Sequence, residues 1–197
     1  MKIIQQGAEA TIIRSNSFII KDRKKKDYRI GCIDTKIRKQ RTKKETKLLE
    51  KASEIISAPK PLSTPQLNQI KMPYISGKKL SEHLDKLKNK EKILEQVGRD
   101  LAKLHDADII HGDLTTSNMI LKNDKVYFID FGLGFISTKI EDKAVDIHLL
   151  KQALEAKHFL YYEKLFKYFL KGYKKSKDYS EVQERLKKVE LRGRYKH

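Results

Sequence analysis

The sequence has few cysteines and no long apolar segment. Cys32 is its one cysteine, which excludes an internal disulfide and any zinc site built from several cysteines. No stretch approaches the roughly 18 apolar residues of a membrane-spanning helix, and the apolar run at the N-terminus is too short for a signal peptide. We therefore expect a cytoplasmic protein with no membrane partner.

Acidic residues are scarce relative to basic ones. The 197 residues include 44 Lys and Arg against 26 Asp and Glu, a formal net charge of +18. A positive field favours nucleic acid, an anionic membrane or an acidic protein, but a lysine-rich solvated surface gives the same total. Composition leaves these alternatives open. With 39% hydrophobic residues the chain is expected to be globular, as one domain or as two small lobes that share a cleft.

The first part of the chain is predicted to be rich in β-strands. Short apolar or β-branched runs between turn residues predict strands at 2–4, 10–14 and 18–21. No Gly or Pro occurs from residue 34 to 57, where apolar positions recur at helical spacing and predict a helix. Prolines then interrupt the chain, and residues 62–66 and 69–74 are expected to pair as a hairpin.

The second part is predicted to be mainly helical. Its helices are expected at 80–87 and 91–106, with three more between 142 and about 189. Two short strands, 119–121 and 126–129, are joined by a turn at Asn123-Asp124. The sequence therefore predicts an α+β fold with a small β-rich lobe at 1–75 and a reduced helical lobe at 76–197.

Two segments of the helical lobe have residue types and a spacing that suit phosphoryl transfer. His111, Asp113 and Asn118 form the pattern H-x-D-x-x-x-x-N, and a predicted strand ends 17 residues after Asp113, at Asp130-Phe131-Gly132. One carboxylate can orient an attacking hydroxyl or water, while a carboxylate and an amide oxygen can hold Mg²⁺. Either segment alone would more simply be a turn or a strand end. Because both occur in order with a strand pair between them, they indicate a Mg-nucleotide site.

These segments resemble those of protein kinases, and two further residues fit the same pattern. Lys21 ends the third predicted strand, where kinases carry the lysine that contacts the phosphates. Glu45 lies midway along the following helix, where kinases carry its carboxylate partner. Taken singly, each is equally well a solvated surface charge. The resemblance implies catalytic roles for Lys21 and Glu45 beside Asp113, Asn118 and Asp130.

The resemblance also places ATP between two other segments. Gly7, Ala8, Glu9 and Ala10 stand where kinases have a Gly-rich phosphate loop, although this loop has one glycine in place of three. Met72, Pro73 and Ile75 resemble the hinge that faces adenine, and Pro73 keeps its carbonyl although it lacks an N–H. With Lys21, these residues are expected to bind ATP. The expected ligands of Mg²⁺ are Asn118 and Asp130.

Three features depart from most protein kinases. Gly112 replaces the arginine that reads a phosphorylated activation loop, and Thr115 replaces a lysine near the transferred phosphate. The interval from Asp130 to Asp146 is 16 residues, too short for a full peptide-binding segment. Asp146 resembles the helix aspartate that supports the catalytic loop. The sequence therefore predicts a minimal kinase.

With these departures and a basic C-terminal end, the chain resembles the Bud-thirty-two/PRPK family, the kinase-like subunit of the KEOPS complex. The resemblance covers almost the whole chain. It implies a bilobal kinase fold, use of ATP and Mg²⁺, and a role in forming threonylcarbamoyladenosine in tRNA. It also implies binding to the threonylcarbamoyl-transferase subunit and other KEOPS subunits, with either ATP hydrolysis or serine/threonine kinase activity.

The basic residues near the C-terminus are candidate tRNA contacts. Arg192, Arg194 and Lys196 follow Glu190 with no further acidic residue. Such a segment suits contact with phosphates, without base-specific recognition. A second basic cluster, at residues 24–26 and 38–44, could contact tRNA or a protein partner instead. The simpler interpretation of both clusters is a solvated surface.

Two other functions remain open at this point. The chain could be a free-standing RIO-like or small-molecule kinase, although the segment after residue 132 leaves little room for an acceptor site. It could also be a pseudoenzyme scaffold, against which the intact set Lys21, Asp113, Asn118 and Asp130 argues. The sequence does not distinguish an independent chain from a part of a fusion protein.

Overall fold

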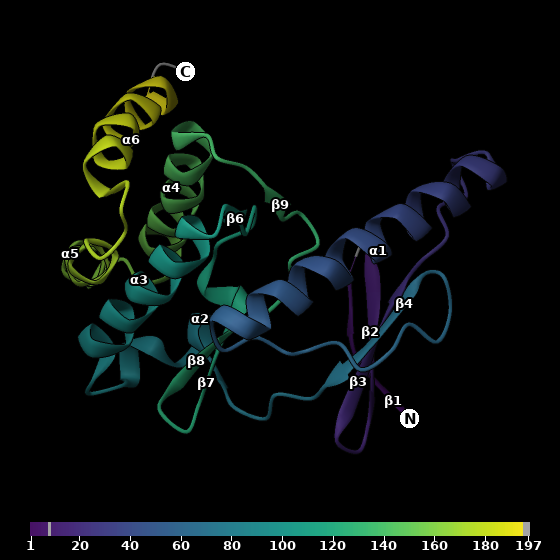
Figure 1. Ribbon diagram of the computed structural model, residues 1–197. Coiled ribbons are helices and arrows are strands. Elements are labelled where there is room, and N and C mark those ends of the chain that lie inside the picture. Colours follow the sequence, from purple (N-terminus) through teal and green to yellow (C-terminus); the bar gives the residue numbers. More distant parts are fainter. Residues whose placement is uncertain (8, 195–197) are drawn as a thin grey trace.

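The computed structural model describes residues 1–7 and 9–194. Its N-terminal part is a four-stranded antiparallel sheet in the order β1-β2-β3-β4, crossed by a long helix (Figure 1). The strands are β1 (Lys2–Gln6), β2 (Ala10–Ser15), β3 (Phe18–Arg23) and β4 (Gln69–Pro73). Asn16 turns the chain between β2 and β3 with a φ of 47°, a left-handed conformation that asparagine tolerates. The first three predicted strands are thus confirmed.

The long helix α1 (Gly31–Ile55) begins earlier than predicted and carries one buried stripe. Leu48, Leu49 and Ala52 lie on this stripe in the hydrophobic core, and Glu45 lies one turn before them. The N-terminal half of α1 projects past the sheet (Figure 1). The buried stripe therefore brings Glu45 to the boundary between the sheet and the helical part.

The predicted hairpin of residues 62–66 and 69–74 forms only in part. Residues 62–66 do not form a strand and contribute a single β-bridge, between Ser63 and Lys71, while β4 pairs with β3 along its length. Pro61 precedes this segment and Pro65 lies within it, and neither has an N–H to donate to a ladder. The prolines limit the pairing, so β4 is the edge strand of the sheet.

The C-terminal part is mainly helical. Around the predicted catalytic segments it also contains a small three-stranded sheet, in the order β5-β7-β8, and the strand pair β6–β9. Its helices are α2 (Leu80–His83), α3 (Lys90–Asp106), α4 (Ile140–Lys157), α5 (Tyr162–Tyr173) and α6 (Tyr179–Arg194), with the 3₁₀ helices η1 (Leu84–Lys86) and η2 (Thr116–Asn118). Its strands are β5 (Lys78–Lys79), β6 (Ile109–Ile110), β7 (Met119–Lys122), β8 (Lys125–Phe128) and β9 (Phe135–Ile136). The three C-terminal helices and the β7–β8 hairpin are confirmed, whereas the pair β6–β9 was not predicted.

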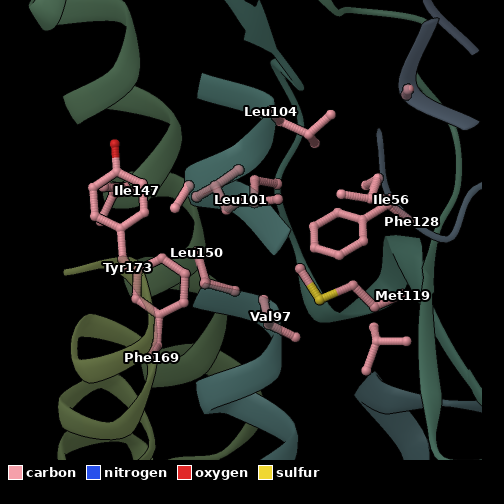
Figure 2. Packing of buried hydrophobic residues seen from close by; sticks show 14 of the residues in the cluster. Ile56, Val97, Leu101, Leu104, Met119, Phe128, Ile147, Leu150, Phe169 and Tyr173 are labelled. Carbon is pink, nitrogen blue, oxygen red and sulfur yellow. The ribbon is translucent and has the colours of Figure 1, made fainter. Parts of the chain in front are cut away.

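Helix α3 is the centre of the hydrophobic core. Figure 2 shows Val97, Leu101 and Leu104 of α3 between the aromatic residues of α5 on one side and Met119 and Phe128 of the β7–β8 hairpin on the other. Helices α3 and α5 approach closely at Gly98, where an added Cβ would lie 2.0 Å from the Phe169 carbonyl oxygen. This packing gives the hairpin and the adjoining loop a rigid base.

None of the helices in the described part of the chain combines the length and apolar character needed to cross a bilayer.

Candidate active site

A cavity of about 460 Å³ lies where the sheet meets the helical part. Its volume falls in the range of small-molecule sites. The predicted site residues that line it are Gly7, Glu9, Ala10, Lys21, Glu45, Met72, Pro73, Ile75, Asp113, Asn118 and Asp130. Ala8 lies outside the described residues. A larger open hollow between α4, α5 and α6 has none of these groups.

Lys21 holds the central position in this cavity. Its side chain leaves β3 and is buried, with Nζ donating to Glu45 Oε1 of α1 at 2.7 Å and to Asp130 Oδ1 at 2.6 Å. Glu45 is 1% exposed, so its charge needs a cation nearby. The ammonium of Lys21 therefore connects the sheet, α1 and the segment after β8.

Arg23 is a second cation paired with Glu45, and it was not among the site residues predicted from the sequence. It lies two residues after Lys21 on β3, and its Nη2 donates to Glu45 Oε2 at 2.5 Å. Residues two apart on a strand share a face, which is the signal that could have identified it. Arg23 also lines the cavity, and its buried Nε has no hydrogen-bond partner among residues 1–7 and 9–194. Glu45 thus has one oxygen for each cation.

Asp130 follows β8 in a left-handed conformation, with a φ of 63°. Burial by itself would raise the pKa of this carboxyl group. The Lys21 ammonium and the backbone N–H of Gly132, which donates to Asp130 Oδ1 at 3.1 Å, outweigh burial and lower the pKa below its ordinary value. Asp130 is therefore ionised at neutral pH, as a metal ligand must be.

Asp113 and Asn118 face each other across the loop between β6 and β7. The Asn118 side-chain nitrogen donates to the Asp113 carboxylate at 2.8 Å and to the Asp113 carbonyl at 2.9 Å. The β7–β8 hairpin closes through Asn123 and Asp124, both with positive φ, and returns the chain to Asp130. This local route brings the three predicted residues to one end of the cavity.

Two oxygens at this end suit a magnesium ion. The Asn118 amide nitrogen is used by Asp113, which leaves its amide oxygen without a donor among the described residues. Asp130 binds Lys21 and Gly132 through Oδ1, and its Oδ2 likewise has no donor in the described part of the chain. Mg²⁺ prefers oxygen ligands and usually keeps waters and phosphate oxygens beside one or two protein ligands. The donor set therefore fits the predicted metal.

Asp146 of α4 supports the loop that carries Asp113. Its carboxylate is buried and accepts from the backbone N–H groups of His111 at 2.8 Å and Gly112 at 3.0 Å. Gly112 has a φ of 77°, and an added Cβ would lie 2.5 Å from the Leu133 carbonyl oxygen. Only glycine fits this position without strain. The arginine found here in most kinases would be excluded by the backbone.

A hydrogen-bonded pair behind Asp146 completes this support. Tyr173 of α5 lies 2.8 Å from His105 Nδ1, and His105 Nε2 lies 3.4 Å from Asp146. The Asp146 carboxylate is an acceptor, which favours the hydrogen of a neutral His105 on Nε2 and leaves Nδ1 to accept from the Tyr173 hydroxyl; burial raises the pKa of that hydroxyl well above its ordinary value. His105 is therefore a structural residue of the helical core.

The loop between β1 and β2 is tied to α1 by a contact that the sequence did not predict. Glu9 accepts from Arg41 Nη1 of α1 at 2.7 Å, and both residues line the cavity. Lys26 Nζ lies 3.9 Å from the same carboxylate. These cations hold Glu9 on the α1 side of the loop.

Of the predicted tRNA contacts, Arg192 is the one whose side chain is described. It is 67% exposed and pairs with Glu141 of α4 at 2.7 Å. Arg194 is the last residue of α6, and Lys196 lies outside the described residues. The end of α6 lies far from the sheet (Figure 1).

Comparison with known proteins identifies relatives over the full length of the chain. Residues 13–141 match the model of the RIO domain. The chain is 45% identical to the KEOPS complex subunit Bud32 of Pyrococcus abyssi, covering 100% of this chain and 97% of that protein. It is 42% identical to the EKC/KEOPS complex subunit BUD32 of Encephalitozoon cuniculi, over 96% of this chain and 93% of the relative.

Other relatives are longer proteins. A protein of Methanobrevibacter smithii named "Probable bifunctional tRNA threonylcarbamoyladenosine biosynthesis protein" is 42% identical over 99% of this chain, which spans 37% of its length. Among solved structures, monomeric WbdD superposes with a TM-score of 0.58 and 19% identity, over 82% of this chain and 44% of that one. WbdD is a bifunctional kinase-methyltransferase, and the likeness supports a kinase-like fold for this chain. The chain belongs to the RIO-domain family and to the Bud32 family.

Proposed function

We propose that this protein is a Mg-ATP-dependent atypical serine/threonine kinase or ATPase that supports threonylcarbamoyladenosine modification of tRNA within a KEOPS complex. The observation that carries the proposal is the convergence of Lys21, Asp113, Asn118 and Asp130 on one cavity. The relatives named as KEOPS subunits and as tRNA threonylcarbamoyladenosine biosynthesis proteins supply the biological process.

Adenine and the phosphates would occupy opposite parts of the cavity. Met72, Pro73 and Ile75 follow β4 and would face adenine, with the backbone as the source of hydrogen bonds. The loop Gly7, Ala8, Glu9 and Ala10 would cover the phosphates. This arrangement directs the reacting end of ATP toward Asp113.

Lys21 would bind the phosphates, and Glu45 would hold Lys21 in place. Lys21 has two carboxylate partners, while Arg23 binds Glu45 independently. Lys21 can therefore turn toward a phosphate oxygen without leaving the buried Glu45 uncompensated. A single cation on Glu45 would not allow this movement at low cost.

Asn118 and Asp130 would hold the metal through their free oxygens. Mg²⁺ bound there would neutralise phosphate charge in the transition state. Asp113 would orient the attacking water or hydroxyl and accept its proton, because its carboxylate lines the cavity and is fixed by Asn118. The same geometry serves hydrolysis and transfer to a protein hydroxyl.

The proposed partners follow from the names of the relatives. Subunits of KEOPS are the proposed protein partners, and a threonylcarbamoyl-transferase subunit is foremost because the bifunctional relatives carry most of their length outside the region matched here. We place the activity in the cytoplasm. The basic surface of the chain would contact tRNA.

Replacing Asp113 with Asn is expected to lower phosphate release from Mg-ATP at least about a hundredfold, since removal of a general base typically costs 10²–10⁴. Release would be measured with the chain alone, with the transferase subunit, and with tRNA added. The matched control is Asp27→Asn, an exposed carboxylate outside the cavity, which should leave the rate unchanged. Partner-dependent release that needs Asp113 supports an ATPase of the complex.

Two outcomes would oppose this proposal. Efficient labelling of unrelated proteins by the chain alone, with little free phosphate, would favour a free-standing kinase. Equal activity of wild type and Asp113→Asn would favour a scaffold, with the phosphate release due to another component.

The basic residues between 192 and 196 are the proposed site of tRNA contact. Changing Arg192, Arg194 and Lys196 together to Ala is expected to weaken tRNA binding and to make the dependence of log K on log salt shallower by about 2–3, with nucleotide binding unchanged. The control removes the same charge at Lys24, Lys25 and Lys26. A larger loss in the control variant would move the tRNA contact to the segment before α1.

A further inference from the structure

A buried histidine outside the cavity connects three segments of the helical part. His158 follows the last residue of α4 and is 2% exposed. Its Nδ1 lies 2.7 Å from Asp85 Oδ1 of η1, and its Nε2 lies 3.2 Å from Thr116 Oγ1 of η2. Neither Asp146 nor any residue of the candidate site takes part in this set, which we call the Asp85–His158–Thr116 chain.

The direction of the hydrogen bond to Asp85 follows from the chemistry of the groups. The Asp85 carboxylate is an acceptor, so Nδ1 of His158 carries the hydrogen. The other nitrogen, Nε2, shares a hydrogen bond with the Thr116 hydroxyl, which can serve as donor or acceptor. The orientation of the Thr116 side chain is thereby determined by Asp85, although the two residues do not touch directly.

The order Asp-His-Thr resembles a nucleophile triad, but the surroundings exclude that role. Thr116 is 1% exposed, and it is not among the residues that line the cavity, whereas its neighbours Ser117 and Asn118 are. A nucleophile needs access to a substrate. Thr116 has none, so the set of hydrogen bonds acts on the position of the chain.

Thr116 lies along the chain between Asp113 and Asn118, whose separation sets the geometry of the proposed reaction. It is the first residue of η2, which ends at Asn118, and Asn118 donates to the Asp113 carboxylate at 2.8 Å. The Asn118 N–H also donates to the Thr115 carbonyl at 3.0 Å, which makes this a single tight turn. A shift of Thr116 would therefore change the position of Asn118 relative to Asp113.

We propose that His158 and Thr116 are positioning residues for phosphoryl transfer. The Asp85–His158–Thr116 chain holds η2 against α2 and α4, both of which contact it, and so keeps the Asn118 oxygen and the Asp113 carboxylate in reacting geometry. The inference rests on the proposed function and assigns two residues that act through Asn118 and Asp113 rather than on the nucleotide.

Valine and serine at position 116 separate the hydroxyl from the shape of the side chain. Thr116→Val keeps the shape but removes the hydroxyl, and it is expected to lower kcat for Mg-ATP turnover about 10- to 100-fold, because small misplacements of catalytic groups cost this much. KM for ATP should change less than about twofold, since Lys21 and the residues proposed to face adenine are untouched. Thr116→Ser keeps the hydroxyl and should stay within about threefold of wild type.

Substitutions at His158 supply the second arm. His158→Gln offers an amide oxygen that can accept from Thr116, so its kcat should exceed that of His158→Ala. The double variant Thr116→Val with His158→Ala should be no slower than the slower single variant, because both single changes remove the same hydrogen bond between residues 116 and 158. All rates are measured on the full chain at a temperature where circular dichroism shows each variant folded.

The outcomes separate this inference from the proposed function. A folded Thr116→Val variant with wild-type kcat, or costs that add fully in the double variant, would overturn the positioning role alone. A proportional rise in KM with unchanged kcat would overturn it as well. A wild-type chain that releases no phosphate from Mg-ATP under any condition would overturn the proposed function and this inference with it.

Discussion

Asp130→Asn is expected to reduce Mg-dependent phosphate release by at least about a thousandfold, or roughly 4 kcal/mol of transition-state stabilisation. Asparagine has nearly the same shape and tolerates the positive φ at this position, so the fold should persist. What it removes is the negative charge on the proposed metal ligand and on the partner of Lys21. The loss should therefore appear in catalysis rather than in folding.

The measurement is single-turnover phosphate release from labelled ATP over a series of Mg²⁺ concentrations. Asp124→Asn is the matched control, because Asp124 also has a positive φ, of 57°, but lies exposed in the β7–β8 turn. The control should match wild type. If Asp130→Asn retained a tenth or more of the activity with the same Mg²⁺ dependence, the assignment of Asp130 as a metal ligand would be wrong.

Glu45→Ala should be among the most destabilising substitutions in the chain, with a cost of about 3–5 kcal/mol in the free energy of unfolding. Glu45 is the buried acceptor for both Lys21 and Arg23, and both cations are themselves buried. Lys21 would keep Asp130 as a partner, whereas Arg23 would lose the carboxylate that compensates its charge. Removing one partner of a buried ion pair costs more free energy of unfolding than the intact pair contributes, because the remaining charge stays desolvated without compensation.

Urea denaturation of Glu45→Ala and Glu50→Ala tests this expectation. Glu50 lies on the same helix but is exposed, and its loss should change the free energy of unfolding by less than about 0.5 kcal/mol. Glu45→Gln keeps the size and a hydrogen-bond acceptor but not the charge, and it should fall between the two. Equal stability of the two alanine variants would contradict the paired arrangement of Lys21, Glu45 and Arg23.

The elements that depend on short-range patterns were predictable from the sequence. Strands β1, β2 and β3 and the β7–β8 hairpin follow from apolar runs and turn residues, and the three C-terminal helices follow from helical periodicity. Asp113, Asn118 and Asp130 were expected to lie together because a short hairpin connects them, and the structure places all three on one cavity. Their roles in catalysis remain predictions.

Contacts between distant segments were not predictable in the same way. The expected hairpin at 62–66 is limited to one bridge because Pro61 and Pro65 cannot donate to a ladder, and the pairing of β4 with β3 was decided by the sheet as a whole. The link between Glu9 and Arg41 joins a loop to a helix 32 residues away. No local pattern distinguishes this arginine from the other cations of α1.

By itself, the sequence determined which chemical groups are present, their order, and their membership of the Bud32 family, because these depend on residue identity and spacing along the chain. Only the tertiary structure decided which charges are buried and what each one pairs with. Arg23 and His158 show the difference: each acquires its role from partners brought by other elements, at Glu45 of α1 and at Asp85 and Thr116. Burial turns an ordinary surface-type residue into one that must be paired, and burial is a property of the packed fold.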